Sequence, residues 1–251
     1  MLFNPKKHNI EYKDPKTKEL MQKVIDFMEN KGLKSIKKDW HDKTWNYEFV
    51  EFMREHQVMA TLMTPSGYGA EDSRWDTSRN VAFAEITAFY GITYWYTFQV
   101  SMLGLAPVWL GSNEELKQKT AKLLQNGEVF AFGLSEKEHG ADIYSSDMML
   151  EPQNDGSYKA NGDKYYIGNG NEAALVSTFG KVKGADDYVF FAVDSKHPNY
   201  KCIKNTVNEQ NYVSEYEVTD YPITDADIME IGPKAWDNML NTINVCKFNL
   251  G

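Results

Sequence analysis

FGLSEKEHGAD, residues 132–142, and NGDKYYIGNG, residues 161–170, are the two stretches that decide the expected fold of this chain. Each joins an apolar run typical of a β-strand to a polar turn that contains glycine. Glycine lets the backbone approach a ligand closely at such a turn, because it carries no Cβ. The two stretches therefore predict a β-rich region in the second half of the chain, with strand ends suited to ligand contact.

The sequence before these stretches carries helical signals. Asp14 and Pro15 form an N-cap and first-turn pair, and Gly32 is placed to end the helix that they begin. Apolar residues recur between them at helical spacing. A second helix is expected over residues 45–59.

Residues 76–111 are apolar on nearly every side, which is typical of helices buried between other helices. We expect two such helices, broken near Gly91 or Gly104. Ser112 and Glu115 then match a capping box, which predicts one more helix before the β-rich region.

The hydrophobic pattern changes at Glu128 from helical spacing to short apolar or alternating runs. Asn154-Asp155-Gly156 and Asn161-Gly162 are expected to be hairpin turns. The predicted strands cover residues 129–134, 173–179, 188–193 and 212–218.

The end of the sequence returns to helical spacing. Its apolar stripe consists of Trp236, Met239, Leu240, Ile243, Cys246 and Leu250. The partner of this stripe is expected in the preceding domains, in another subunit or in a continuation of the chain.

Together these patterns predict an α+β protein. An all-helical bundle is expected over residues 1–127 and a small β-barrel or sandwich over 128–232. A helix over 233–251 would open a further, missing C-terminal helical domain.

Composition limits the function classes. The net charge of -9 disfavours nucleic acid as a partner, because backbone binding needs clustered Lys and Arg. No apolar run is long enough for a membrane span or a signal peptide. Two cysteines are too few for a disulfide scaffold. We expect a cytoplasmic protein.

The order of helical bundle, β domain and helix, together with the two opening stretches, resembles the acyl-CoA dehydrogenase family. Residues 111–119 are similar to the glycine-serine, glutamate and glutamine-lysine run that precedes the family's flavin segment, and residues 65–69 to its proline and glycine loop. In the first opening stretch, Glu136, Gly140 and Asp142 match the family pattern, whereas Lys137 replaces a proline.

The resemblance implies FAD as cofactor and an acyl-CoA as substrate, and Gly140 and Ala141 would also contact the substrate. Tyr166 would lie over one face of the flavin ring system, and Gly168 stands where the family carries a threonine hydroxyl. The implied cofactor contacts are Phe132, Leu134, Ser135, Gly140, Ala141, Tyr166, Ile167 and Gly168.

The implied reaction is α,β-dehydrogenation, with an electron-transfer flavoprotein as acceptor and a homo-oligomer as the working form. The family's catalytic glutamate has no counterpart in this sequence, so we expect no catalytic residue here and a base beyond Gly251. The chain alone is expected to turn over no substrate. No metal site is expected.

Other interpretations stay open. Glu136 and Asp142 match an acid/base pair, but turn-capping or solvated carboxylates account for them better. His139 is expected to be a loop residue rather than a metal ligand. At the level of function, the alternatives are a non-catalytic two-domain scaffold, an acyl-CoA oxidase or a flavin monooxygenase.

Overall fold

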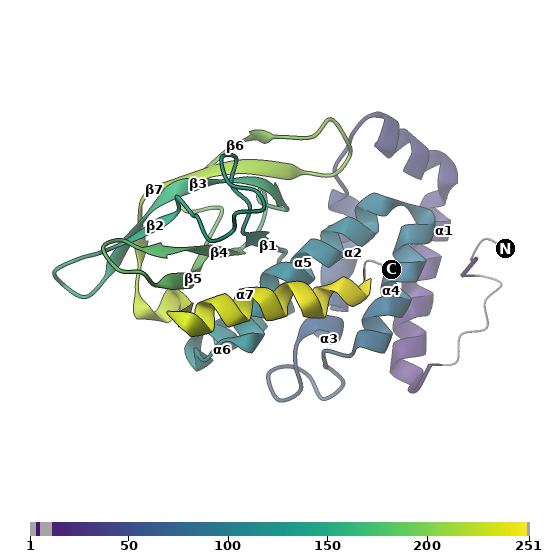
Figure 1. Ribbon diagram of the computed structural model, residues 1–251. Coiled ribbons are helices and arrows are strands. Elements are labelled where there is room, and N and C mark those ends of the chain that lie inside the picture. Colours follow the sequence, from purple (N-terminus) through teal and green to yellow (C-terminus); the bar gives the residue numbers. More distant parts are fainter. Residues whose placement is uncertain (1–3, 6–11, 250–251) are drawn as a thin grey trace.

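The computed structural model describes residues 4–5 and 12–249, in which a group of helices packs against one end of a mixed β-sheet (Figure 1). A final helix, α7, runs from the sheet back to the helices, and the 3-10 turn Lys247–Asn249 that follows it lies beside α4. The helices before the sheet are α1 (Pro15–His41), α2 (Tyr47–Glu55), α3 (Val58–Met63), α4 (Thr77–Tyr90), α5 (Ile92–Leu110) and α6 (Glu114–Gln125). The chain has the α+β architecture expected from its sequence.

Local chemistry explains where the first helices begin and bend. The Asp14 carboxylate accepts the backbone N–H of Thr17 at 2.7 Å and caps α1. Gly32 adopts a positive φ of 75° and kinks α1 instead of ending it, so the helix continues to His41. The predicted helix over 45–59 is two helices, because Gln57 takes a left-handed φ of 53° between them.

The apolar stretch over 76–111 forms two helices, α4 and α5, as predicted. They meet at Gly91, whereas Gly104 lies inside α5. The cap of α6 is one residue later than predicted, because the side chain of Asn113, not Ser112, accepts the N–H of Leu116 at 3.0 Å.

The sheet has the strand order β6-β7-β3-β2-β4-β5-β8, and β1 also pairs with β4. Neighbours are antiparallel except for β1 and β2, which both run parallel to β4. The strands are β1 (Phe130–Gly133), β2 (Met149–Pro152), β3 (Tyr158–Gly168), β4 (Leu175–Val182), β5 (Tyr188–Val193), β6 (Tyr200–Asn205), β7 (Val213–Ile223) and β8 (Ile228–Ile231). A 3-10 turn, Asp225–Asp227, precedes β8.

Strands β1 and β2 pair with successive segments of one strand, β4. Phe130 to Gly133 pair with Leu175 to Thr178, and Met149 with Leu150 pair with Lys181 and Val182. The chain between them leaves the sheet at Leu134 and returns at Met148. We call residues 134–148 the β1–β2 loop. This loop contains most of the first opening stretch, so the break between two short strands projects it out of the sheet.

The turn predicted at Asn161-Gly162 is wrong, because both residues lie inside β3. The side chain of Asn161 accepts the backbone N–H of Asp220 at 2.8 Å, where β7 bulges. A Cβ on Gly162 would lie 2.8 Å from the Cα of Met148, so glycine is needed for close packing. The Asn-Gly pair therefore serves a bulge and a close approach. The turn at residues 154–156 does join β2 to β3.

Helix α5 joins the helices to the sheet through a backbone contact. A Cβ built on Gly104 would lie 2.5 to 2.8 Å from the backbone of Ala131. The buried amide of Asn169 donates to the carbonyl oxygens of Thr97, at 3.0 Å, and Phe130, at 3.1 Å. The helix and the sheet thus share hydrogen bonds at their contact, which fixes the ends of β1 and β3 relative to α5.

Helix α7 (Pro233–Cys246) places the predicted C-terminal stripe on two faces. Met239 and Cys246 are buried against the preceding elements, and the side-chain amide of Gln99 donates to the carbonyl of Cys246 at 3.0 Å. In contrast, Leu240 is 39% exposed. A 3-10 turn, Lys247–Asn249, follows, and Leu250 lies outside the described residues.

Within residues 4–5 and 12–249, no helix combines the length and the hydropathy that a membrane crossing requires.

The contact at Gly104 gives a test of the packing. Replacing a glycine by alanine inside a helix ordinarily stabilises a protein by about 1 kcal/mol. Gly104→Ala is instead expected to lower the free energy of unfolding by roughly 1–3 kcal/mol, because backbone atoms cannot move aside cheaply. Urea unfolding measures this change, and a stabilised variant would contradict the described contact.

Candidate functional site

The β1–β2 loop and the bulged end of β3 enclose a cavity of about 440 Å³. Both opening stretches of the sequence contribute to its wall. The cavity is lined by Leu134, Ser135, Glu136, Lys137, His139, Gly140, Ile143, Ser145, Ser146, Tyr165, Tyr166 and Phe179. The loop follows β1, whereas the two tyrosines lie on β3, and a backbone hydrogen bond from Tyr165 to Ser135 joins these two parts of the wall.

A buried ion pair ties the loop to the sheet. The ammonium of Lys164 lies 2.6 Å from Oε1 of Glu136 and donates to the carbonyl oxygen of Leu134 at 3.1 Å. Side-chain exposure is 0% for Lys164 and 5% for Glu136. The same carboxylate accepts the Ser146 hydroxyl at 2.6 Å and the Asp147 N–H at 2.8 Å. Glu136 therefore holds the two ends of the loop together.

The ionisation of this pair follows from its surroundings. Burial by itself would raise the pKa of Glu136, but the Lys164 charge and the donated hydrogen bonds lower the pKa below its usual value. Burial lowers the pKa of Lys164, and Glu136 opposes that change. A carboxylate with a lowered pKa and several donors is a poor proton acceptor. Glu136 is thus a structural anion, although it is a buried ion-pair partner and not the turn-capping or solvated carboxylate that the sequence predicts.

Tyr166 is held in an unusual backbone conformation that turns its ring outward. Its φ is 62°, a value that bulky residues seldom adopt and that costs about 1 kcal/mol or more. Tyr165 and Tyr166 together oppose the single residue Glu215 of β7, which is a β-bulge. The Tyr166 side chain is 58% exposed and lines the cavity. Ordinary strand packing does not explain this ring.

The structure brings four of the eight predicted cofactor contacts together. Leu134, Ser135, Gly140 and Tyr166 all line the cavity. Ser135 is exposed. Its backbone carbonyl oxygen accepts the N–H of Tyr165 at 2.9 Å, so the start of the loop is still hydrogen-bonded to β3.

The other four predicted contacts lie outside the cavity lining. Ala141 is exposed on the loop, and the Phe132 ring packs 5.9 Å from the Phe190 ring. Ile167 is 1% exposed and belongs to a buried core cluster made of strand residues. A Cβ on Gly168 would lie 2.7 Å from the Tyr96 hydroxyl oxygen of α5. Packing against α5 therefore explains the glycine at this position.

His139 lies between two carboxylates of the same loop. Its Nδ1 is 2.9 Å from Oδ2 of Asp142, and its Nε2 is 3.2 Å from Oδ2 of Asp147. These hydrogen bonds, Asp142 first, raise the pKa of His139 and favour the imidazolium. Glu136, His139 and Asp147 have ligand atoms within 4.8 Å of one another. Since Glu136 already binds Lys164 and both ring nitrogens face carboxylates, the cluster forms an ion-pair chain.

Sequence reasoning missed Lys164, Tyr165 and Phe179 as parts of the site. Lys164 follows the charged Asp163, so its sequence neighbours do not mark it as buried, and only its burial shows that it needs a partner. Phe179 comes from β4, and only the strand order brings it to the cavity.

Comparison with known proteins places this geometry in context. No protein-family profile matches the chain. A curated relative, the short-chain specific acyl-CoA dehydrogenase of Megasphaera elsdenii, is 24% identical over 181 residues, which cover 70% of this chain and 47% of that protein. The chain therefore spans about half the length of the curated relative that it matches.

Solved structures share the fold. Butyryl-CoA dehydrogenase from Megasphaera elsdenii superposes with a TM-score of 0.83 at 18% identity, over 97% of this chain and 65% of that chain. An acyl-CoA dehydrogenase from Bacillus anthracis, solved with FAD, superposes with a TM-score of 0.73 at 20% identity, over 99% of this chain and 42% of that chain.

The buried ion pair can be tested by a double-mutant cycle. Lys164→Met leaves the Glu136 carboxylate buried without a counter-ion and is expected to cost about 3–5 kcal/mol of unfolding free energy. Adding Glu136→Gln is expected to recover part of that loss, because no unpaired charge then remains buried. Urea unfolding of the wild type, both single variants and the double variant measures the coupling.

Lys159→Met is the matched control on the same strand. Lys159 pairs with Asp220 at the surface, at 3.2 Å, so its loss is expected to cost less than about 1 kcal/mol. Equal losses for Lys164→Met and Lys159→Met, or additive losses in the cycle, would show that the ion pair does not fasten the loop.

Proposed function

On the premise that the fold and the curated relative support the acyl-CoA dehydrogenase family, we propose that this chain forms the β-domain wall of a groove for FAD and an acyl-CoA thioester. The activity that this wall serves is α,β-dehydrogenation of the acyl group. One observation carries the proposal. Both family-like segments meet at a single cavity, where a strained β-bulge turns the Tyr166 ring outward.

The residues of the cavity fit a flavin ring system. The exposed ring of Tyr166 offers a flat aromatic face, which favours stacking with another ring. Ser135 is exposed at the end of β1, and a Cβ on Gly140 would meet nothing within 4 Å. The loop backbone at Gly140 can therefore approach a phosphate or thioester group. Bound FAD would supply the hydride acceptor.

The chain's own residues have three tasks in this proposal. Tyr166 excludes water from one face of the bound ring system. Ser135 donates a hydrogen bond toward the ligand from the edge of the sheet. Glu136 and Lys164 keep these groups in place, and Glu136 does not remove the α-proton, because its lowered pKa and its donors oppose protonation.

We assign the catalytic carboxylate and the opposite wall of the groove to polypeptide outside the described residues. The outward apolar residues near the C-terminal end support this assignment. Leu240 is 39% exposed and Phe248 is 68% exposed on and just after α7, and helical polypeptide could pack there. The working form is a homo-oligomer in the cytoplasm, with an electron-transfer flavoprotein as acceptor.

A second candidate function is a scaffold that binds neither flavin nor thioester. The packing at Gly168 favours it, because Tyr96 excludes any side chain at the position where the family places a hydroxyl. The two functions differ in whether the chain binds FAD.

Titration of FAD into the purified chain, followed by flavin fluorescence, tests the proposal. Wild-type protein is expected to bind FAD and to quench its emission through stacking on Tyr166. Tyr166→Leu is expected to weaken binding about threefold to tenfold, since an aromatic pair contributes about 0.5–1.5 kcal/mol, and to reduce the quenching.

Tyr47→Leu provides the control, because Tyr47 has nearly the same exposure, 57%, but lies in the helical part. Absence of FAD binding by the wild-type chain would favour the scaffold. If Tyr166→Leu and Tyr47→Leu changed FAD binding equally, Tyr166 would not be a residue of the flavin groove.

A further inference from the structure

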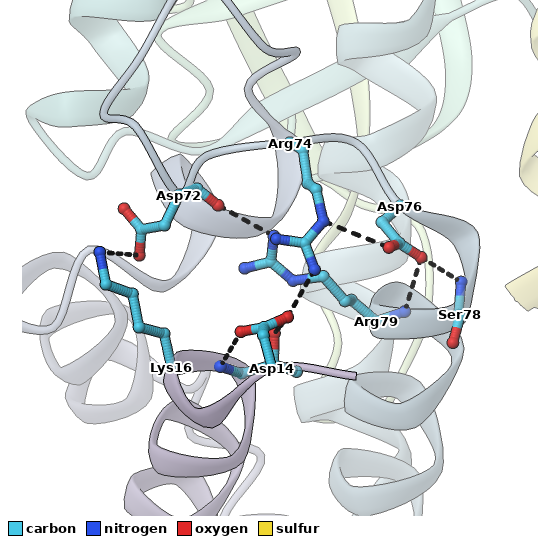
Figure 2. Close-up of polar contacts among 8 residues, drawn as sticks. Asp14, Lys16, Asp72, Arg74, Asp76, Ser78 and Arg79 are labelled. Carbon is cyan, nitrogen blue, oxygen red and sulfur yellow. Dashed lines mark hydrogen bonds and ion pairs between the residues drawn. The ribbon is translucent and has the colours of Figure 1, made fainter. Parts of the chain in front are cut away.

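A second cavity, of about 230 Å³, lies between the first turns of α1 and α4, among the helices. Its walls include the N-cap residues of both helices, Asp14 and Asp76, and two arginines, Arg74 and Arg79. Figure 2 shows how these groups face one another. The cavity is not part of the groove described above, and its interpretation does not depend on flavin binding.

Both cap carboxylates already accept hydrogen bonds, and Arg74 pairs with each of them. Arg74 donates to Asp14 at 2.6 Å and to Asp76 at 3.3 Å (Figure 2). Asp14 also accepts the Thr17 N–H, and Asp76 accepts the Ser78 N–H at 2.9 Å. The charges of Asp14, Asp76 and Arg74 are therefore paired with one another, and the two carboxylates also accept backbone N–H groups at the starts of α1 and α4.

Arg79 is different, because its charge is buried without a carboxylate in contact. The residue is 4% exposed. Its Nη1 donates to the backbone carbonyl of Asp72 at 3.0 Å, and its buried Nε has no hydrogen-bond partner. Among the described residues, no carboxylate oxygen lies within ion-pair distance of its guanidinium.

The surroundings compensate this charge only in part, because Asp14, Asp76 and Asp72 act on it from beyond ion-pair distance. Burial lowers the pKa of Arg79, and the nearby Arg74 lowers it further, against the opposing effect of Asp14 and Asp76. A guanidinium nevertheless stays protonated in proteins. A buried, unpaired cation is strongly unfavourable unless an anion joins it.

The cavity limits which anion fits. The amino ends of α1 and α4 are already capped by Asp14 and Asp76, so the positive charge that an anion would meet comes from Arg79 and Lys13. Asp14, Asp76 and the rim carboxylate of Glu85 oppose a second negative charge. Val81 and Ala82 supply apolar wall. A single carboxylate on a short apolar chain satisfies all of these conditions better than a phosphate dianion.

We propose that this cavity binds a small organic monocarboxylate, whose oxygens pair with the guanidinium of Arg79. Lys13 lines the cavity as well and adds positive charge to it. Nη1 of Arg79 is used by the Asp72 carbonyl and its Nε is closed off from the cavity, so the carboxylate approaches the remaining nitrogen, Nη2.

Thermal unfolding in low-chloride buffer, with propionate as the probe, tests this site. The wild-type melting temperature is expected to rise and saturate with propionate, more than with chloride at equal ionic strength. Arg79→Met is expected to lose this response and, without propionate, to unfold at the same or a higher temperature, because it removes an unpaired buried charge. A merely structural arginine would instead destabilise the protein when it is replaced.

Lys16→Met is the control. Lys16 lies on the first turn of α1 but is exposed and pairs loosely with Asp72, at 3.9 Å, so this variant should keep the propionate response. If Arg79→Met does not fold, Arg79→Lys replaces it, and calorimetric titration should then show at least tenfold weaker binding of propionate.

The proposal is overturned if chloride matches propionate, if Arg79→Met retains the response, or if Arg79→Lys binds as tightly as the wild type. A response to inorganic phosphate alone would also overturn the assignment to a monocarboxylate.

Discussion

The ion pair between Glu136 and Lys164 is the interaction on which the candidate groove depends. The sheet has a gap where β1 ends and β2 has not yet begun, and the β1–β2 loop leaves through that gap. Lys164 fills it from the neighbouring strand and joins the beginning of the loop to its end through one carboxylate. A buried lysine is tolerated here because its charge is paired and hydrogen-bonded. Glu136 and Lys164 are therefore part of the buried interior and also hold the cavity wall in position.

Backbone strain is concentrated beside this ion pair. Tyr166 and Asn169 both have positive φ, near 60°, at the end of β3. One turns a ring toward the cavity, and the other turns an amide into the contact with α5. Such conformations persist where the surrounding structure determines them strongly, and they are frequent at functional sites. The bulge thus joins the helix–sheet contact to the wall of the groove.

The sequence predicted the elements better than the contacts between them. Helical spacing predicted the two buried helices and offered Gly91 or Gly104 as their break, of which Gly91 is the break and Gly104 lies inside α5. The two opening stretches supplied four predicted residues that line the cavity. The hairpin predicted at Asn161-Gly162 is wrong, because the same pair that favours a hairpin also suits a strand where Asn161 bonds a bulge and Gly162 packs closely on Met148. The burial of Ile167, the approach of Tyr96 to Gly168 and the role of Lys164 depend on strand order and helix packing, which spacing along one chain does not encode.

Hydrogen–deuterium exchange of the chain with and without FAD tests the central claim, that the β1–β2 loop and the bulge of β3 form one wall of a flavin groove. The account predicts slower exchange on adding FAD in residues 134–147 and 165–168, and unchanged exchange in α1 and α2. Slower exchange in the helices alone, or no change anywhere at saturating FAD, would contradict it.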